Sequence, residues 1–375
     1  MIGVSVSDLN DPTLVCGGSS ERAFRLVPEG LVAGKTAAAV VLSGEGCWLA
    51  GGPTAFTRAR LLWRTAEGAA GEASFGLEAL RRWADQAGGG SNLDTALERL
   101  SATRPEIVSV GHKRPKIVGV LNVTPDSFSD GGKFDSTDDA IRHGVTMIEE
   151  GADLIDIGGE STRPGADPVS PEEQCRRILP VVEGLARRVP VSVDTQSATV
   201  MQKSLEAGAD IINDVSALSA DPHALDVVAT ADCPVILMHS LRAPKTMQAA
   251  PHYRDVRLDI TDYLDSRIRA CVSGGITREK IIIDPGIGFG QNDEHIALLI
   301  RDLAVLHGLG CPLMLGASRK SFIARVDRPG PAAGRLGGSV AAAILGLARG
   351  VQFLRVHDIA QTRQAVTIWA HAESR

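Results

Sequence analysis

Polar and ionisable residues end most of the short apolar runs in the C-terminal two thirds of the chain. These runs are rich in valine and isoleucine, which is typical of strands buried on both faces. Packing alone does not explain a repeated change from apolar to polar at such ends. The residues at the ends are Asn122, Asp156, Asp194, Asn213, His239, Asp284, Ser318 with Lys320, and Arg355 with His357. Amides, carboxylates and bases placed in this way indicate a catalytic site.

Arg355 and His357 have the spacing of an anion-binding pair. They are separated by one residue, and strand side chains repeat every two residues, so both point to the same side. A guanidinium grips phosphate oxygens as a fork. Thr162 and Arg163, in the sequence GGESTRPG, add a hydroxyl and a second guanidinium, so that a diphosphate can be held between them. An ion pair with an acid such as Asp358 is the alternative interpretation of Arg355.

Asp194 and Asp284 are carboxylates at the ends of the third and sixth apolar runs. A carboxylate between apolar walls is costly unless some group donates hydrogen bonds to it. A heterocycle with amino and ring N–H groups supplies such donors, and the amide of Asn213 both donates and accepts. A pair of acids that transfers protons, as in glycosidases, is the alternative. The separation of the two acids, which would decide between these interpretations, is left open by the sequence.

Two turns add further chemical signals. The segment Ile281–Gly290 reads IIIDPGIGFG, and its glycines permit close approach of the backbone to a flat ligand. The segment Gly316–Phe322 reads GASRKSF and places Lys320 where a strand passes into a helix. Backbone N–H groups and an ammonium therefore face one cavity. A solvated lysine at a helix start is the alternative for Lys320.

The elements that must position these residues alternate regularly from Lys116 onward. Eight strand–helix units in about 260 residues are typical of a closed α/β barrel of the (β/α)₈ or TIM type, whose catalytic groups lie at the carboxyl ends of the strands. The absence of GxGxxG after the first run disfavours an open doubly wound sheet. The predicted strands are Ile117–Leu121, Leu154–Ile157, Val189–Val193, Asp210–Ile212, Val235–Met238, Ile281–Ile283, Leu313–Leu315 and Gln352–Val356.

Helical stretches separate these strands. They include Asp138–Glu150, Pro171–Arg188, Ala198–Ala207, Asp255–Ser273, Asn292–His307 and Leu336–Arg349. Glycines follow several helical stretches, where a left-handed C-cap is expected: Gly151, Gly208, Gly275, Gly308 and Gly350. The loop after the first strand, which reads TPDSFSDGG, is expected to be a flexible lid.

Residues 1–114 lack the regular strand–helix alternation of the later chain. They are expected to form a small N-terminal α/β appendage, with the barrel in residues 115–375. Two short amphipathic helices are predicted in the appendage, one presenting Leu77, Leu80 and Trp83 and the other presenting Leu93, Leu97 and Leu100. No catalytic constellation occurs there. Packing against the main domain is the expected role.

Composition excludes several classes of protein. The formal net charge is -6 over 375 residues, and no basic block stands out, which argues against a binder of nucleic acid or membrane surfaces. The six cysteines lack the spacing of a disulfide framework or zinc site. The N-terminus carries acidic residues rather than a signal peptide, and no run is long enough to span a bilayer. A cytoplasmic location is expected.

The motifs taken together resemble those of the dihydropteroate synthases, which are pterin-binding enzymes of folate biosynthesis. The segments VLNVTPDSFSDGG, DIGGESTRPG, SVDT, IINDVSAL, LMHS, DPGIGFG, GASRKSF and RVHD occur in that family's order. Each motif is modest alone, but eight in order are highly specific. The resemblance covers residues from about 115 to 370 and assigns no task to the appendage.

The resemblance implies a transferase that joins (7,8-dihydropterin-6-yl)methyl diphosphate to 4-aminobenzoate, giving 7,8-dihydropteroate and pyrophosphate. Asn122 would bind Mg²⁺ through its amide oxygen, and Thr162, Arg355 and His357 would hold the diphosphate. The implied pterin site is Asp194, Asn213, Met238, Asp284, Gly316 and Lys320. The implied aminobenzoate site, which is also the sulfonamide target, is Phe128, Arg163, Pro164 and Ser321. The family makes a homodimer the expected assembly.

Two departures from the family's pattern lie beside the implied pterin pocket. Gln291 stands where a lysine is common, and Ser240-Leu241-Arg242 replaces a smaller turn. Both bear on pterin affinity more than on reaction type. Two other functions stay open: a pterin-dependent methyltransferase, which needs no diphosphate grip, and a paralogue that binds pterin without catalysis.

Overall fold

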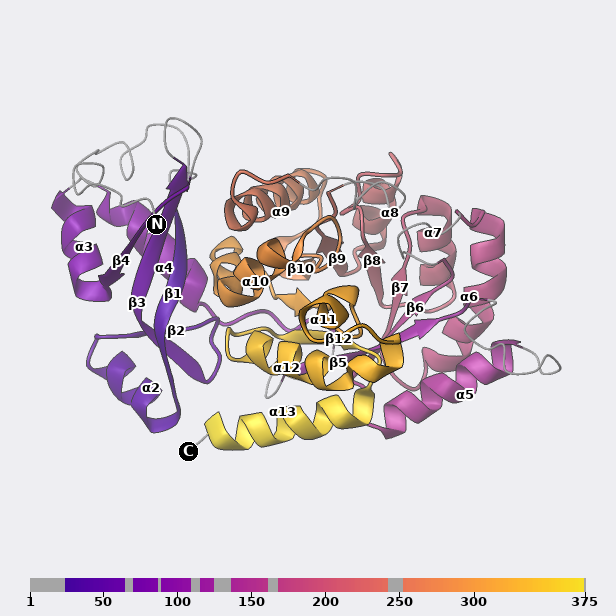
Figure 1. Ribbon diagram of the computed structural model, residues 1–375. Coiled ribbons are helices and arrows are strands. Elements are labelled where there is room, and N and C mark those ends of the chain that lie inside the picture. Colours follow the sequence, from indigo (N-terminus) through magenta and orange to yellow (C-terminus); the bar gives the residue numbers. More distant parts are fainter. Residues whose placement is uncertain are drawn as a thin grey trace.

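The structure is a computed structural model of the chain, and it describes residues 24–64, 70–86, 89–108, 115–124, 136–160, 168–241 and 252–373. Two β-sheets organise these residues. A small antiparallel sheet near the N-terminus lies beside a large parallel barrel formed by strands from Lys116 onward (Figure 1). The predicted boundary at residue 114 falls outside the described ranges.

Eight parallel strands build the barrel, which confirms the predicted (β/α)₈ fold. Their order around the sheet is β10-β9-β8-β7-β6-β5-β12-β11, and a parallel bridge between Ile283 and Leu313 joins the two ends. The strands are β5 (Lys116–Asn122), β6 (Leu154–Gly158), β7 (Val191–Asp194), β8 (Ile211–Asp214), β9 (Val235–Met238), β10 (Ile281–Asp284), β11 (Met314–Leu315) and β12 (Phe353–Val356).

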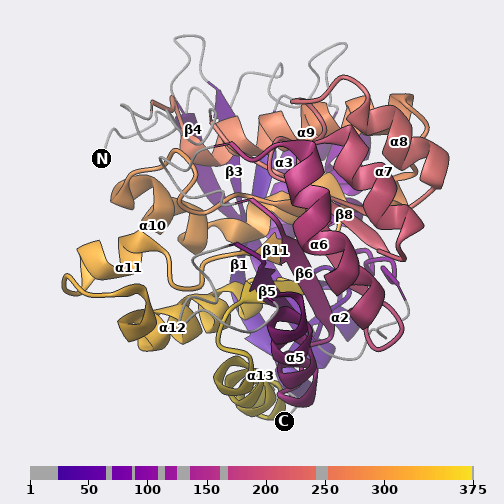
Figure 2. The same ribbon diagram turned by 90° about the vertical axis from the view of Figure 1, so that its right-hand side faces the viewer.

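Helices surround the barrel, with α5, α6 and α7 in front of the strands in Figure 2. They are α5 (Ser136–Glu149), α6 (Pro171–Leu185), α7 (Ala198–Glu206), α8 (Ala224–Ala231), α9 (Val256–Ser273), α10 (Asp293–Arg301), α11 (Ser321–Val326), α12 (Leu336–Leu347) and α13 (Ile359–Glu373). The six predicted helices are found, but the one expected over Asn292–His307 is divided. Its second part is the 3₁₀ segment η4 (Leu303–Leu309).

This division makes one predicted glycine cap wrong. Gly151, Gly208, Gly275 and Gly350 have positive φ as expected, whereas Gly308 does not. Because η4 extends past Gly308, the left-handed residue that ends the segment is Gly310, at φ 76°. Hydrophobic spacing alone did not distinguish one long helix from a helix followed by 3₁₀ turns.

The interior of the barrel changes from apolar to polar along the strands. One buried cluster contains Val118, Leu154, Ile211, Ile236, Ile282, Met314 and Phe353, one from each of seven strands, together with Ile107 from the segment before β5. Side chains of a strand return to the same face every two residues. The next inward positions are therefore Asp156, Asn213, Met238, Asp284, Gly316 and Arg355, and they place the predicted polar groups above an apolar floor.

The N-terminal sheet is antiparallel and centres on β3 (Thr54–Arg64). Its other strands are β1 (Arg25–Ala33), β2 (Cys47–Trp48) and β4 (Ala70–Gly76), accompanied by helices α2 (Gly34–Leu42), α3 (Leu77–Gln86) and α4 (Gly90–Ser101). Helices α3 and α4 confirm the two amphipathic predictions. Leu61 and Trp63 pack into the appendage's own core, whereas Leu62 joins the barrel core. Both faces of this sheet are thus covered.

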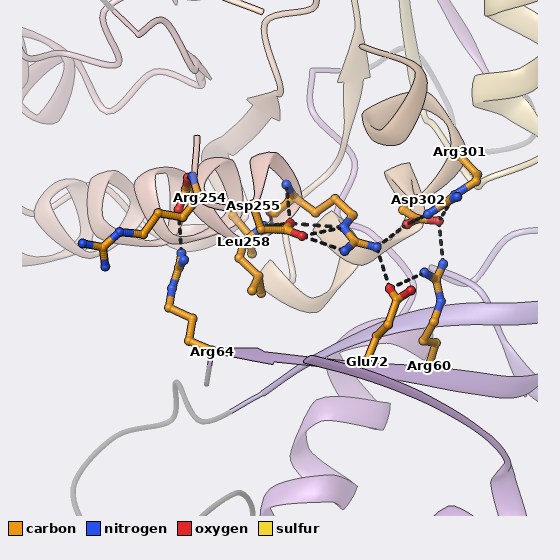
Figure 3. Close-up of polar contacts among 11 residues, drawn as sticks. Arg60, Arg64, Glu72, Arg254, Asp255, Leu258, Arg301 and Asp302 are labelled. Atoms are coloured by element: carbon orange, nitrogen blue, oxygen red, sulfur yellow. Dashed lines mark hydrogen bonds and ion pairs between the residues drawn. The ribbon is translucent and has the colours of Figure 1, made fainter. Parts of the chain in front are cut away.

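A partly buried ionic network joins the N-terminal sheet to helices α9 and α10 of the barrel (Figure 3). Arg257, near the start of α9, bonds to Asp255, to Asp302 at 2.9 Å and to Glu72 of β4 at 2.9 Å. Arg60 of β3 bonds to the same Asp302 at 2.7 Å and to Glu72 at 2.8 Å. These contacts fix the appendage on the barrel. Among the residues that the structure describes, no helix has both the length and the apolar character needed to cross a membrane.

Candidate active site

The carboxyl ends of four adjacent strands place three of the predicted residues in one row. Asn122 of β5 pairs in register with Gly158 of β6, Gly158 pairs with Asp194 of β7, and Asp194 pairs with Asn213 of β8. A Cβ added at Gly158 would lie 3.5 Å from Oδ1 of Asn122 and 3.7 Å from Cβ of Asp194. Glycine at this position therefore leaves the space between the two side chains open.

One cavity brings together all six residues assigned to pterin. Its lining is Asp194, Asn213, Val215, Met238, Asp284, Gly286, Phe289, Gly316, Lys320 and Arg355. Val215, Met238 and Phe289 form a small buried apolar cluster of their own. Carboxylate, amide and ammonium groups beside apolar and aromatic walls suit a flat heterocycle that carries several N–H groups. Val215 and Phe289 were not singled out from the sequence, although each lies within a motif that was.

Arg355 is held by carboxylates inside the barrel rather than at the rim. Its Nε donates to Oδ2 of Asp156 at 2.7 Å, and its Nη2 donates to Oδ2 of Asp194 at 3.0 Å. Asp358, the alternative partner, bonds instead to the guanidinium of Arg319. Asp156, which is fully buried, was recognised from the sequence as a strand-end residue but received no role.

His357 lies against Ser318 beside the cavity, outside its lining, as a neutral hydrogen-bonding group. Its Nδ1 lies 3.1 Å from Oγ of Ser318, and its backbone N–H donates to the same oxygen at 3.2 Å. Burial, and then the charges of Arg355 and Arg319, lower the pKa of His357 to about 4. At neutral pH its imidazole can therefore donate a hydrogen bond to an anion but adds no charge.

A strained backbone positions Lys320. The preceding residue, Arg319, has φ 57°, a left-handed conformation that costs a non-glycine residue about 1–2 kcal/mol. Its N–H donates to Oγ of Ser339 at 2.9 Å, and its carbonyl accepts from Arg335 at 2.8 Å. With the Asp358 ion pair, these contacts fix the turn that directs Lys320 into the cavity.

The ammonium of Lys320 lies 4.0 Å from the ring centroid of Phe289, a cation–π contact. Burial, and then the charge of Arg355, lower its pKa to about 8. Lys320 is thus not a solvated lysine at a helix start. Burial also raises the pKa of Asp194 to about 7 and that of Asp284 to about 6, although Arg355 and Lys320 oppose the shift. Donors from a ligand would stabilise both carboxylates.

The turn after β10 positions Asp284 and passes close to the backbone of His239. Oδ1 of Asp284 accepts from the N–H of Gly286 at 2.7 Å. Gly286 has φ 65°, and a Cβ there would lie 1.9 Å from the carbonyl oxygen of His239, so that only glycine fits. Gln291, one of the two departures, is buried and accepts from the N–H of Gly288 at 2.6 Å. It therefore supports this turn.

Comparison with known proteins agrees with this geometry. Residues 118–357 match the profile of the family described as pterin binding enzyme. The chain is 46% identical over 262 residues to dihydropteroate synthase of Escherichia coli K12, which covers 69% of this chain and 92% of that protein. Its identity to dihydropteroate synthase of Bacillus subtilis is 42% over 262 residues, with coverage of 69% and 88%.

The chain belongs to the pterin-binding enzymes, among the dihydropteroate synthases. Solved structures agree. Dihydropteroate synthase of Xanthomonas albilineans with 4-aminobenzoic acid matches at 45% identity and TM-score 0.67, covering 70% of this chain and 94% of that one. The same organism's enzyme in complex with 7,8-dihydropteroate matches at 43% identity and TM-score 0.64, with coverage of 70% and 95%. The match to the family profile, over residues 118–357, lies within the barrel.

Several predicted residues are not in the cavity or cannot be placed. Phe128, Thr162, Arg163 and Pro164 lie outside the described residues, as does Arg242 of the second departure. Ser321 is exposed at the start of α11, where its Oγ accepts from Arg325 at 2.9 Å. The assignment of these residues to aminobenzoate and diphosphate stays a prediction.

Proposed function

We propose that this chain catalyses the dihydropteroate synthase reaction, joining (7,8-dihydropterin-6-yl)methyl diphosphate to 4-aminobenzoate with release of pyrophosphate. The observation that carries the proposal is the single cavity shared by Asp194, Asp284, Lys320 and Arg355. It combines acceptors for a nitrogen heterocycle with a cation suited to phosphate, at the carboxyl ends of barrel strands. This combination also argues against a methyltransferase, which would not need the phosphate grip.

The pterin ring would be read by hydrogen bonds at its edge. Asp284 and Asp194 accept from its amino and ring N–H groups, and Asn213 provides both a donor and an acceptor. The apolar groups Met238 and Phe289 would cover the faces of the ring. Binding there brings donors to carboxylates whose pKa values burial has raised, so we expect the ligand to lower both values.

Departure of the diphosphate would be assisted by charge and by hydrogen bonds. Negative charge grows on the diphosphate as its C–O bond breaks, and Arg355 can neutralise part of it while neutral His357 donates a hydrogen bond. The arylamine is a neutral nucleophile, so it needs correct placement more than a base. The diphosphate site would be completed by Thr162. The aminobenzoate site would be formed by Phe128, Arg163, Pro164 and Ser321.

Magnesium is the proposed metal, with Asn122 as its protein ligand. Mg²⁺ prefers oxygen ligands and retains several waters, so one amide oxygen with the diphosphate is a reasonable set. The open space that Gly158 leaves beside Oδ1 of Asn122 fits such an ion. When bound, the metal would neutralise charge on the diphosphate.

A homodimer through the last helices is the proposed assembly. Leu345 of α12 and Ile368 of α13 are large apolar side chains that are 44% and 68% exposed. Burial of such side chains in a subunit interface would remove apolar area from water. Sedimentation velocity at several concentrations tests this assembly, and a monomer throughout would contradict it.

Pyrophosphate release tests the activity. The purified protein is mixed with the pterin diphosphate, 4-aminobenzoate and Mg²⁺, and an active dihydropteroate synthase is run in parallel. We expect release that depends on both substrates and is inhibited by sulfonamides in competition with aminobenzoate. Asp284→Asn should raise the KM for the pterin substrate by about 10- to 100-fold, the value of a charge-assisted hydrogen bond. Asp139→Asn, in a surface ion pair with Arg142 of α5, is the matched control. No release by the wild-type protein would leave a paralogue that only binds pterin.

A further inference from the structure

We propose that Asp156 is a positioning residue that holds Arg355 while the guanidinium exchanges Asp194 for the second oxygen of Asp156 on substrate binding. The inference rests on the proposed function, because it concerns how the same cavity accepts pterin and diphosphate. Asp156 lies on β6 with no exposed surface. It is not in the cavity lining, so it acts through its neighbours Arg355 and Asn213.

Arg355 and the pterin compete for one carboxylate. Nη2 of Arg355 donates to Oδ2 of Asp194 at 3.0 Å. Asp194 is also the acceptor that the pterin needs, and Arg355 is also the cation that the diphosphate needs. A pterin N–H that takes Oδ2 of Asp194 therefore displaces Nη2 of Arg355 from that oxygen. A buried guanidinium cannot simply be released, because an unpaired charge in the interior is costly.

Asp156 provides the second partner. Its Oδ2 already accepts from Nε of Arg355 at 2.7 Å, whereas its Oδ1 is buried and has no hydrogen-bond partner within the described part of the chain. Nε and Nη2 lie on the same edge of the guanidinium and match the two oxygens of one carboxylate. A small turn about the existing Nε bond would place Nη2 on Oδ1. Oδ2 of Asp194 would then be free for pterin, and Nη1 of Arg355 would stay available to the diphosphate.

The carboxylate of Asp156 also orients the side-chain amide of Asn213, which is proposed to bind the pterin ring. Nδ2 of Asn213 donates to Oδ2 of Asp156 at 3.1 Å. With its amino group directed to a carboxylate, the amide keeps its Oδ1 for an N–H donor of the ligand. Asp156 therefore fixes one residue of the diphosphate grip and one residue of the pterin site at the same time.

Substitution of Asp156 tests the inference. Asp156→Asn keeps the size but replaces one oxygen with an amino group and removes the charge. We expect the KM for the pterin diphosphate and the Kd of pyrophosphate to rise about 10- to 100-fold, and the KM for 4-aminobenzoate to stay within about twofold. Asp153→Asn is the matched control, since Asp153 lies just before the same strand in an ion pair with Arg363 outside the cavity. We expect it to change none of the three constants.

Two results would overturn the inference. One is an unchanged pterin KM in Asp156→Asn, and the other is an equal loss in Asp153→Asn, which would indicate general destabilisation. If Asp156→Asn fails to fold, a crystal structure of the wild-type protein with the pterin diphosphate decides. We expect Nη2 of Arg355 on Oδ1 of Asp156, and its retention on Asp194 would refute the proposal. Wild-type pyrophosphate release, measured first, separates this failure from failure of the proposed function.

Discussion

Replacement of Arg257 by methionine tests whether the appendage and the barrel form one cooperative unit. Arg257 is 6% exposed and bonds to Asp255, Asp302 and Glu72, so it contacts both parts of the protein. Methionine retains most of the apolar stem and removes only the guanidinium. The change therefore isolates the charged contacts from the packing.

The expected loss of stability is about 3 kcal/mol. Removing one partner of a buried ion pair costs about 3–5 kcal/mol because the other charge is left unpaired. The lower end of this range applies because both carboxylates retain other partners. Asp302 retains its ion pairs with Arg60 and Arg301, and Asp255 still accepts hydrogen bonds from N–H groups of the first turn of α9. At about 2.1 cal/mol/K per residue over 375 residues, this loss lowers the melting temperature by about 4 °C.

Differential scanning calorimetry measures the effect. We expect one transition in the wild-type protein, since Leu62 of the appendage lies in the barrel core and Ala304 of η4 lies in the appendage core. The matched control is Arg176→Met, whose guanidinium pairs with Glu173 on the surface of α6 and is 71% exposed. Because exposed ion pairs are screened by water, we expect this variant to melt at the wild-type temperature within experimental error. Two separate wild-type transitions, or equal shifts in the two variants, would refute the reasoning.

Three further predictions concern single groups. Burial, and then the charge of Arg104, lower the pKa of His307 to about 3, so its folded pKa lies below the unfolded value of 6.5. The stability that this neutral histidine contributes is present above pH 6.5 and is lost towards pH 3. Urea unfolding across this range should therefore show that the free energy of unfolding falls less steeply with falling pH in His307→Gln than in the wild-type protein. The difference in slope is up to about 1.4 kcal/mol per pH unit. Pterin affinity, measured by calorimetry, should fall as pH rises through about 8, where Lys320 loses its proton, and Lys320→Gln should remove this dependence. Gly286→Ala should lower pterin affinity by about tenfold or more because its Cβ would meet the carbonyl of His239, and unaltered binding would contradict the fit described for that turn.

The sequence by itself determined the barrel and the identity of most groups around its mouth. Apolar runs that end in polar residues, repeated eight times, correspond to the strands β5 to β12 within a few residues. The two-residue period of a strand also fixed which residues face inward, since Asp284 lies two positions beyond Ile282 and Arg355 two beyond Phe353. These features are local in the chain, so periodicity and motif spacing are sufficient to predict them.

Only the tertiary structure decided which partners these groups have. Arg355 forms ion pairs with Asp156 and Asp194, because strands distant in sequence converge in the barrel. Asp358, which is nearer in sequence, pairs with Arg319 instead. The ionic network around Arg257 likewise joins residues nearly two hundred positions apart, such as Glu72. Sequence spacing carries no information on such contacts. They depend on how the barrel closes and on how the N-terminal sheet packs against it.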